Sequence, residues 1–182
     1  MLTLVRKTDT EISSGLLSAL KKYKKYFSSV LISSAMSDSE ALLEYKEALS
    51  KTESFFYFID NFKLKTFAWS NIIVQSILKA PIVFVSKYPY TRNIIYLNKY
   101  SFQLREVIEK PNFNASTGIY ILNPEVYNFI EQSSDIDLII KSWAKVNRKK
   151  ARGSREKSNI LVFPIEGWSP NDRRRTNQRV NH

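Results

Sequence analysis

The hydrophobic positions of this chain fall into two kinds of segment, which alternate along the sequence. In one kind, apolar residues recur three or four positions apart, as on one face of a helix; the other kind is a short continuous apolar run, typical of a buried strand. Helical spacing covers residues 16–27, 38–49, 69–78, 124–130 and 136–146. The segment 69–78 also fits a strand, but its spacing favours a helix. Continuous runs cover residues 28–35, 55–59, 82–85, 93–97, 102–108, 117–122 and 160–163. The pattern therefore predicts helices alternating with strands.

Such alternation favours a parallel sheet, because consecutive parallel strands need a crossover and right-handed crossovers lay a helix across the sheet. We predict an α/β fold, a three-layer α/β/α sandwich with a mainly parallel, mixed sheet. The 182 residues, 43% of them hydrophobic, suffice for one domain with a core. We expect a single domain over residues 1–168 and a basic, flexible tail over residues 169–182.

Composition excludes several kinds of chemistry. The chain has no cysteine, which excludes disulfides, thiolate zinc sites and cysteine nucleophiles, and its one histidine is the last residue, His182. The N-terminal residues lack an apolar signal core, and the most apolar stretch, residues 71–85, is interrupted by Gln75, Lys79 and Pro81. We therefore expect a cytoplasmic protein without a membrane span.

The net charge of +11 is concentrated at the C-terminus. Residues 141–182 carry 12 Lys and Arg against 3 Asp and Glu, whereas residues 1–140 carry 16 against 14. Basic runs of this kind bind polyanions by releasing counterions, so a nucleic acid or an acidic protein is one possible partner. A solvated helix end followed by a disordered tail is an equal alternative. The candidate nucleic-acid-binding residues are Arg148, Lys149, Lys150, Arg152, Arg155, Arg173, Arg174 and Arg175.

The most informative motif is Glu109-Lys110-Pro111, followed after a short loop by a strand that opens on Thr117-Gly118. A carboxylate accepts hydrogen bonds from adjacent hydroxyls, an ammonium offsets phosphate charge, and glycine allows close approach to the backbone. Such a corner suits a phosphorylated sugar. Asp60 ends the aromatic run 55–59, and because ligands bind beyond the carboxyl ends of parallel strands, it could face the same crevice. The plainer alternatives are an exposed pair before a turn, a β-bulge at Gly118 and a simple turn at Asp60.

These residues resemble the sugar-phosphate nucleotidyltransferases, a family with the nucleotide-diphospho-sugar transferase fold. The similar motifs are Glu109-Lys110-Pro111, Thr117-Gly118-Ile119-Tyr120 with Asn123-Pro124-Glu125-Val126, and Phe163-Pro164-Ile165-Glu166-Gly167-Trp168. The resemblance is strongest over residues 81–168. It implies that Asp60 binds Mg²⁺, that Glu109 and Lys110 contact the sugar and its phosphate, and that Thr117 and Gly118 line the sugar pocket. Asp60 and Lys110 would then be the catalytic residues.

The chain also departs from the family. The family's first strand leads into a glycine-rich loop that ends in an arginine and wraps the nucleotide phosphates, and the first residues of this chain show nothing like it. Ser116 stands where many members have an asparagine that contacts the sugar. Asp172 is a weak match for the family's second metal-binding aspartate. The resemblance thus implies a shortened, diverged nucleotidyltransferase that handles a nucleotide sugar or sugar 1-phosphate, with Mg²⁺ if it is active.

Two alternatives remain open. One is a catalytically inactive descendant of the same fold that binds nucleic acid or a protein through its basic C-terminal segment. The other is a metal-dependent glycosyltransferase, since Asp135-Ile136-Asp137 has the Asp-x-Asp pattern that holds a metal-bound nucleotide sugar. The setting of that tripeptide, directly before an apolar-periodic segment, favours a helix cap. The sequence leaves open whether the chain is an enzyme and whether it forms an oligomer.

Overall fold

A computed structural model describes residues 1–78, 81–89, 94–97, 104–108, 112–151 and 160–170. Its strands are β1 (Leu2–Arg6), β2 (Ser29–Ser33), β3 (Phe55–Ile59), β4 (Phe62–Leu64), β5 (Ile82–Pro89), β6 (Ile94–Leu97), β7 (Leu104–Ile108), β8 (Asn112–Leu122), β9 (Leu161–Pro164) and β10 (Trp168–Pro170). The α-helices are α1 (Ser14–Lys22), α2 (Asp38–Glu44), α3 (Lys46–Leu49), α4 (Thr66–Gln75) and α5 (Ile136–Ala151). Three short 3-10 helices are η1 (Ser76–Leu78), η2 (Pro124–Asn128) and η3 (Ile130–Gln132).

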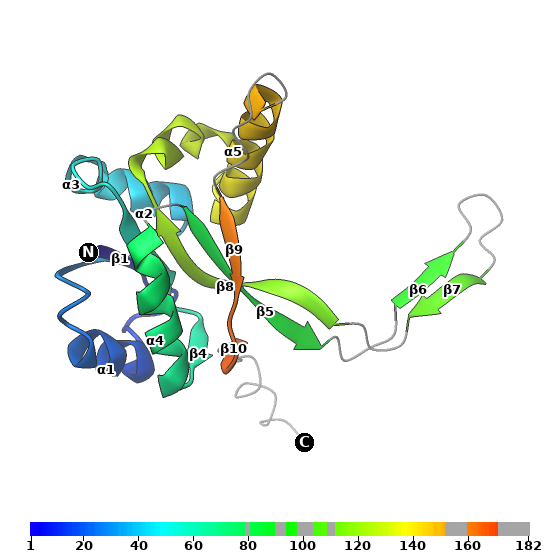
Figure 1. The fold of residues 1–182 in the computed structure, drawn as a ribbon, viewed down its shortest axis with the longest axis horizontal. Helices are drawn as coiled ribbons and strands as arrows, with labels where there is room; N and C mark the ends of the chain where they lie inside the picture. Colours follow the sequence, from blue (N-terminus) through cyan, green and yellow to red (C-terminus); the bar gives the residue numbers. More distant parts are fainter. Residues whose placement is uncertain (79–80, 90–93, 98–103, 109–111, 152–159, 171–182) are drawn as a thin grey trace.

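Six strands form the main sheet in the order β2-β1-β3-β8-β5-β9 (Figure 1). The pairs β1–β2, β1–β3 and β5–β9 are parallel. β8 runs antiparallel to both of its neighbours, β3 and β5. The predicted mainly parallel, mixed sheet is therefore confirmed.

Helices cover both faces of this sheet, so the three-layer α/β/α prediction is also confirmed. Successive residues of β3 point to opposite faces: Phe56 and Phe58 enter one core with α1 and α4, whereas Phe55, Tyr57 and Ile59 enter the other with α2, α3 and α5. All five are at most 7% exposed. Because both faces of β3 are covered, each of its residues is hydrophobic, which accounts for the continuous aromatic run in the sequence.

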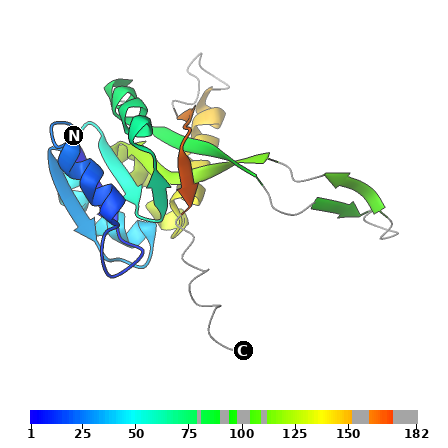
Figure 2. The ribbon, with the colours of Figure 1, turned by 90° about the horizontal axis from the view of Figure 1, so that it is seen from below.

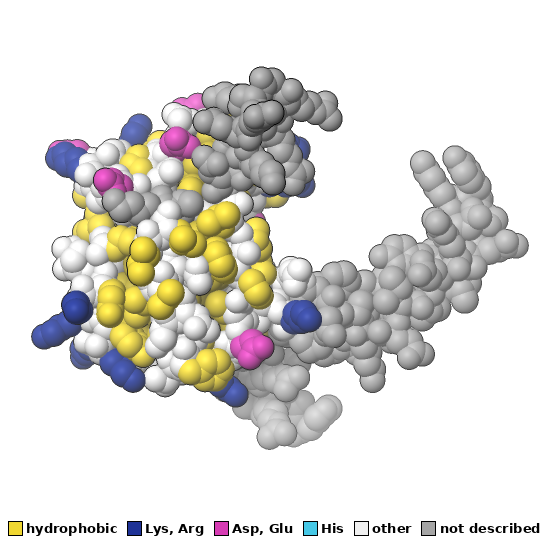
Figure 3. All heavy atoms as spheres, viewed as in Figure 1, with side chains coloured by type: hydrophobic (Ala, Val, Ile, Leu, Met, Phe, Trp, Pro, Cys, Tyr) yellow, Lys and Arg dark blue, Asp and Glu magenta, His cyan; other side chains and the backbone are white. Residues whose placement is uncertain are grey.

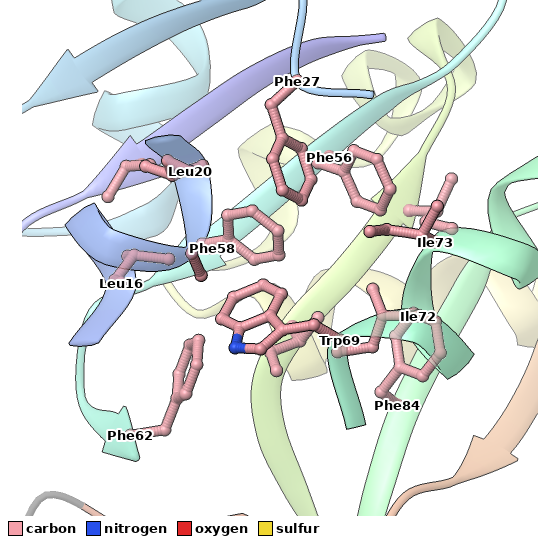
Figure 4. Packing of buried hydrophobic residues seen from close by; sticks show 14 of the residues in the cluster. Leu16, Leu20, Phe27, Phe56, Phe58, Phe62, Trp69, Ile72, Ile73 and Phe84 are labelled. Atoms are coloured by element: carbon pink, nitrogen blue, oxygen red, sulfur yellow. The ribbon is translucent and has the colours of Figure 1, made fainter. Parts of the chain in front are cut away.

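Aromatic rings fill the core beneath α1 and α4 (Figure 4). Phe27 meets Phe56, Phe58 and Trp69 edge to face, with ring centroids 5.2, 5.9 and 6.2 Å apart. Edge-to-face contact is a favoured arrangement of aromatic pairs, and each such pair adds about 0.5–1.5 kcal/mol beyond its buried area. This packing fixes α1 and α4 on the sheet and so places the loops at the ends of β1 and β3.

Two sequence predictions about strands need correction. Residues 28–35 were expected to form a buried strand, but β2 is an edge strand on which Val30 and Ile32 are 38% and 44% exposed. No element was expected at the N-terminus, yet β1 lies in the sheet between β2 and β3, with Leu4 and Val5 fully buried. Its alternating contacts with the two cores explain why neither a helical nor a one-faced strand pattern was evident.

The remaining elements follow the predictions with changes in detail. The expected helix over 38–49 divides into α2 and α3, and the expected helix at Pro124 is the 3-10 helix η2. β6 and β7 pair antiparallel in a two-stranded sheet of their own, which lies away from the main sheet in both views (Figures 1 and 2). β10 pairs with β4 in a second small sheet. Among the described residues, no helix has the length and apolar character needed to cross a membrane.

Candidate functional site

The carboxyl ends of β1 and β3 form the natural ligand-binding edge of the main sheet. The crossover from β1 to β2 passes through α1, whose Leu16 and Leu20 lie in one core. The connection from β2 to β3 passes through α2, whose Leu42 lies in the opposite core. In open α/β sheets, ligands bind at the carboxyl ends of the strands, at the point where one connection crosses one face of the sheet and the next connection crosses the other face. The loop after β1 and the residues after β3 therefore frame the candidate site.

Asp60 lies at this point, directly after β3, and is 2% exposed. Its two carboxylate oxygens accept hydrogen bonds from Ser13, one from the backbone N–H and one from Oγ, both at 2.6 Å. Its backbone carbonyl accepts a hydrogen bond from the Thr8 hydroxyl at 2.7 Å, and its N–H donates to the Arg6 carbonyl at 3.0 Å. Asp60 thus holds the loop between β1 and α1 against the end of β3.

The described groups around Asp60 do not by themselves make up the magnesium site that the resemblance implies. Mg²⁺ requires a nearly octahedral set of oxygen ligands, and among the described residues Asp60 is the one carboxylate at this point, with each of its oxygens accepting a hydrogen bond from Ser13. Within the described ranges, no group of three or more His, Cys, Asp or Glu is arranged to hold a metal ion. The second predicted ligand, Asp172, lies outside those ranges. Magnesium binding by Asp60 stays a prediction.

A cavity of about 350 Å³ opens beside Ser13, between the start of α1 and β4. Ser13 is the N-cap of α1, where its Oγ accepts a hydrogen bond from the N–H of Leu16 at 3.4 Å. The first turn of α1 contains no acidic side chain, and the exposed Lys63 lies on the opposite wall. The cavity is lined by Ser13, Ser14, Gly15, Leu16, Phe62, Lys63, Leu64 and Trp69. Its polar wall is therefore one of small side chains, backbone donors and a cation.

A second cavity, of about 320 Å³, lies across the loop at the carboxyl ends of β1 and β2. Arg6, Lys7, Thr8 and Asp9 form one wall, and residues 34–36 form the other. Lys7 Nζ donates to the carbonyl of Thr10 at 3.0 Å. No glycine occurs between β1 and Ser13, so the loop lacks the glycine-rich character of the family's phosphate loop, although it follows a first strand as that loop does.

Thr117 and Gly118 meet the Asp60 region from β8. Gly118 has φ +75°, and a Cβ placed there would lie 2.9 Å from Asn61 Oδ1 and 3.2 Å from the Ile59 carbonyl oxygen. Thr117 is fully buried, and its hydroxyl donates to the Phe84 carbonyl at 2.8 Å. The pairing register of β5 and β8 shifts at this point, which confirms the β-bulge interpretation of Gly118. The structure thus brings Asp60, Thr117 and Gly118 together, with the Thr117 hydroxyl engaged by the sheet.

Ser116 faces the other layer. Its Oγ lies 2.6 Å from the hydroxyl of Tyr120, which donates to Asp137 Oδ1 at 3.0 Å. Burial raises the pKa of Tyr120, and the charge of Asp137 adds to the effect. Ser116 therefore takes part in a contact between β8 and the start of α5, away from Asp60.

The Asp-x-Asp tripeptide begins α5 as the capping interpretation predicts. Asp135 Oδ1 accepts hydrogen bonds from the N–H groups of Asp137 and Leu138, at 2.8 and 3.2 Å. Asp137 lies in the first turn and is the partner of Tyr120. In the structure, both carboxylates serve the start of a helix and its packing on β8.

The pKa of Asp137 leads to a pH-dependent prediction. Although the residue is largely exposed, its carboxyl group packs against protein atoms, and this desolvation raises its pKa above 3.8, against opposing hydrogen bonds from Tyr120 and Ser116. The folded chain therefore binds this proton more tightly than the unfolded chain, and ionisation costs stability as pH rises. We expect Asp137→Asn to gain melting temperature relative to the native chain between about pH 3 and about pH 7, by no more than about 2 °C because of solvent screening. Calorimetric melting of both chains across this pH range checks the prediction. A melting-temperature difference that becomes smaller as pH rises would contradict it.

One cluster at the carboxyl ends of the strands, centred on Asp38, was missed from the sequence. Ser37 is the N-cap of α2, and Asp38 is 5% exposed. Asp38 Oδ1 accepts hydrogen bonds from Arg6 Nε and the Tyr57 hydroxyl, both at 2.6 Å, and Oδ2 accepts one from the N–H of Ile136 at 3.0 Å. Asp38 therefore connects β1, β3 and α5.

The charges in this cluster reinforce one another. Burial lowers the pKa of Arg6, but the Asp38 carboxylate and Tyr57 together raise it above its ordinary value. Burial and the charge of Asp38 raise the pKa of Tyr57, so its hydroxyl stays protonated and donates. An acidic residue among polar residues in the first turn of a helix, as Asp38 is in α2, gives no sequence signal of long-range burial.

Several predicted site residues cannot be placed. Glu109, Lys110 and Asp172 lie outside the described residues, as do Arg152, Arg155, Arg173, Arg174 and Arg175. Arg148, Lys149 and Lys150 belong to the last turns of α5, where the backbone alone is described. The strand before Glu109, β7, belongs to the separate hairpin, so the inference that Glu109 and Lys110 follow a strand of the main parallel sheet does not hold.

Comparison with known proteins gives similar solved structures but no sequence relatives. No protein-family model and no curated protein matches the chain. A structure assigned as a glucose-1-phosphate thymidylyltransferase from Bacillus anthracis, in complex with a sucrose, is 13% identical with a TM-score of 0.47, over 91% of this chain and 69% of that one. HddC from Yersinia pseudotuberculosis is 11% identical with a TM-score of 0.42, over 92% and 71%. A UDP-glucose pyrophosphorylase complexed with UDP-glucose is 17% identical with a TM-score of 0.46, over 91% and 72%.

The names of the first and third structures are those of sugar-phosphate nucleotidyltransferases, the family that the sequence motifs resemble. The observed α/β/α sandwich with one antiparallel strand is the architecture predicted for this chain.

Proposed function

We propose that this chain binds a nucleotide sugar or a sugar phosphate at the carboxyl ends of β1 and β3, as a diverged protein of the sugar-phosphate nucleotidyltransferase kind. The observation that carries the proposal is the cavity of about 350 Å³ between α1 and β4. The cavity lies at the carboxyl ends of β1 and β3, next to Asp60, where the strand connections pass to opposite faces of the sheet. This is the position expected of a ligand site.

The lining of the cavity suits an anionic, partly apolar ligand. Ser13, Ser14 and Gly15 present the start of a helix, where the N–H and hydroxyl of Ser13 already bind the Asp60 carboxylate, so the donors proposed for a phosphate are the N–H groups of Ser14 and Gly15. Lys63 adds a positive charge from the facing strand. Phe62, Leu64 and Trp69 provide apolar surface of the kind that lines small-molecule pockets.

From the resemblance, we propose that Glu109 and Lys110 also contact this ligand. Both residues lie outside the part of the chain that the structure describes. Lys110 would meet a phosphate and Glu109 a pair of sugar hydroxyls. Nucleotidyl transfer depends on positive charge placed on the phosphates. Since the described donors do not form a magnesium site, the proposal is binding of the ligand, and no catalytic step is assigned to the metal.

Titration with UDP-glucose and glucose 1-phosphate, each with and without Mg²⁺, tests the proposal. A compound that binds the folded chain raises its melting temperature by mass action. Lys63→Ala should weaken binding at least about tenfold, because a hydrogen bond to a charged group contributes roughly 1.5–3 kcal/mol and each 1.4 kcal/mol is a factor of about ten. The matched control is Lys141→Ala on the exposed side of α5. Calorimetric titration of the three chains gives the dissociation constants.

The outcomes test the class of the ligand and the location of its site separately. If neither compound binds, the proposed ligand class is wrong. If one binds with equal affinity to Lys63→Ala and Lys141→Ala, the cavity between α1 and β4 is not its site. Repeating the titration with Lys110→Ala shows whether the resemblance assigned the phosphate contact correctly.

Two other functions stay predictions from the sequence. Polyanion binding by the C-terminal basic residues would weaken steeply with salt concentration, more steeply than binding of one small ligand in the cavity between α1 and β4. The capping role of Asp135 argues against metal-dependent glycosyl transfer through Asp135 and Asp137.

A further inference from the structure

A groove with apolar walls lies between α1 and the edge strand β2. It has a volume of about 530 Å³. Leu17 on α1 and Val30 and Ile32 on β2 belong to its walls, and they are 38%, 38% and 44% exposed. Among the described residues, none that lines this groove also lines the cavity between α1 and β4. The groove is therefore a surface separate from the proposed ligand site.

Strand β2 has one edge that no described strand pairs with, because its neighbour in the sheet is β1 alone. The Ser33 carbonyl accepts a hydrogen bond from the N–H of Lys7 at 2.9 Å, so Ser33 directs its backbone groups to the β1 side. Alternate residues of a strand face opposite neighbours, so Val30 and Ile32 direct theirs outward. The Ile32 carbonyl accordingly accepts from the Tyr45 hydroxyl at 2.8 Å. The two outward N–H groups and the Val30 carbonyl are placed to pair with an added strand.

The sequence of β2 does not protect this edge. Proteins usually block an exposed edge with charged side chains, proline or a covering segment, whereas β2 reads Ser-Val-Leu-Ile-Ser. The side chains of Val30 and Ile32 line the groove, so a strand added at this edge would place every second side chain in it. Edge and groove together fit an extended peptide that binds by strand addition.

The charge around the groove indicates an acidic peptide. Residues 12–37, which include every described residue that lines the groove, contain four lysines and no Asp or Glu. Lys21 and Lys24 line the groove itself and are exposed. No carboxylate of the described residues forms an ion pair with either. Figure 3 shows Lys and Arg side chains gathered at the lower left, where Figure 1 places α1.

Other occupants match these features less well. A second copy would bring the same lysines to the contact, and the chain's own C-terminal residues 141–182 are basic. A nucleic acid would use the lysines but not the apolar walls. We propose that α1 and β2 bind an extended acidic segment of another protein, which adds a strand to the edge of β2 and places apolar side chains in the groove.

A designed peptide, Thr-Glu-Thr-Val-Thr-Val-Thr-Glu, tests the proposal. In a strand its Val and Glu side chains share one face, the valines for the groove and the glutamates for the lysines. Fluorescence anisotropy of the labelled peptide should show saturable binding as the full chain is added up to about 300 μM. A second peptide, with both valines replaced by serine, has the same charge. It should bind at least about tenfold more weakly, because it buries no large apolar side chain.

Val30→Pro tests the backbone contact. It removes an N–H that faces outward and no hydrogen bond between β2 and β1, so the peptide should bind roughly tenfold more weakly while the fold is retained. The matched control is Val162→Pro on β9, the opposite edge strand. The N–H of Leu161 donates to the Pro81 carbonyl, next to β5, so that of Val162 faces outward. This variant should bind the peptide as the native chain does, and melting curves show whether both variants are folded.

A double variant, Lys21→Gln with Lys24→Gln, tests the charge. Glutamine and lysine have similar helix propensities, so the fold is retained and binding should weaken about fivefold at low salt. Lys141→Gln with Lys145→Gln removes the same charge from exposed positions of α5, in the opposite layer, and should leave binding unchanged.

Four results would overturn the proposal. They are no saturable binding of the valine peptide, equal affinity for the serine peptide, equal effects of Val30→Pro and Val162→Pro, and equal effects of the two lysine pairs. Cosedimentation of the chain with phosphatidylserine vesicles, without binding of the valine peptide, would assign the groove to a lipid surface instead.

Discussion

Replacing Asp38 with alanine should destabilise the fold by about 3–5 kcal/mol, because one partner of a buried ion pair is then left without its counter-charge. The side chains of Arg6 and Asp38 are 15% and 6% exposed, and their contact is 2.6 Å. The Tyr57 hydroxyl and the N–H of Ile136 would lose their acceptor at the same time. Urea denaturation, followed by circular dichroism, measures the free energy of unfolding.

The matched control is Glu47→Ala, which removes another ion pair of similar length. Glu47 and Lys51 lie 2.8 Å apart but are 90% and 72% exposed, and such pairs contribute at most about 0.5 kcal/mol. Asp38→Asn keeps an acceptor oxygen and removes the charge, so its loss of stability should fall between the two. Equal effects of Asp38→Ala and Glu47→Ala would show that burial does not strengthen the Asp38 contacts.

Gly118→Ala should cost about 2–4 kcal/mol, since a left-handed backbone strains any other residue and the new methyl group has no space. At φ +75°, the added Cβ would meet Asn61 Oδ1 at 2.9 Å and the Ile59 carbonyl oxygen at 3.2 Å. The Asn61 side chain can move, but the Ile59 carbonyl belongs to β3 and cannot move freely. Denaturant unfolding of the variant gives the cost.

Gly15→Ala provides the comparison, because a Cβ at this position in α1 would have nothing within 4 Å. Alanine is the better helix former, so this variant should gain up to about 1 kcal/mol. If Gly118→Ala is as stable as the native chain, the bulge in β8 adapts to a side chain and the glycine is not required there.

The sequence predicted the central layers of the fold because burial on both faces leaves a simple signature. The aromatic run that became β3 could be identified from its residues alone, whereas the spacing over 69–78 favoured a helix over a strand and is helical in α4 and η1. β2 resembled a buried strand because Val30 and Ile32 are apolar, and nothing local distinguishes an edge strand from a central one. β1 was missed because its few residues alternate between two cores formed by distant segments.

The candidate site was predictable to a smaller extent. The sequence placed Asp60 in one crevice with Glu109 and Lys110, which lie outside the described residues and so stay a prediction. Gly118 lies beside Ile59 and Asn61, the chain neighbours of Asp60. The hydrogen bonds from Ser13 to Asp60 were not foreseeable, because they join residues 47 positions apart. The burial of Asp38 depends likewise on Ile136, 98 positions away.

The position of β8 between β3 and β5 has a consequence for the newly made chain. β3 ends at Ile59, but the strand that pairs with its second edge begins only at Asn112. At about 5–20 residues per second, synthesis of the intervening 50 or so residues leaves that edge open for roughly 3–10 s. The exposed segment is Phe-Phe-Tyr-Phe-Ile, without charge or proline, a composition prone to pair with strands of other chains. Aggregation during biosynthesis should therefore start at β3, and completion of β8 ends the hazard.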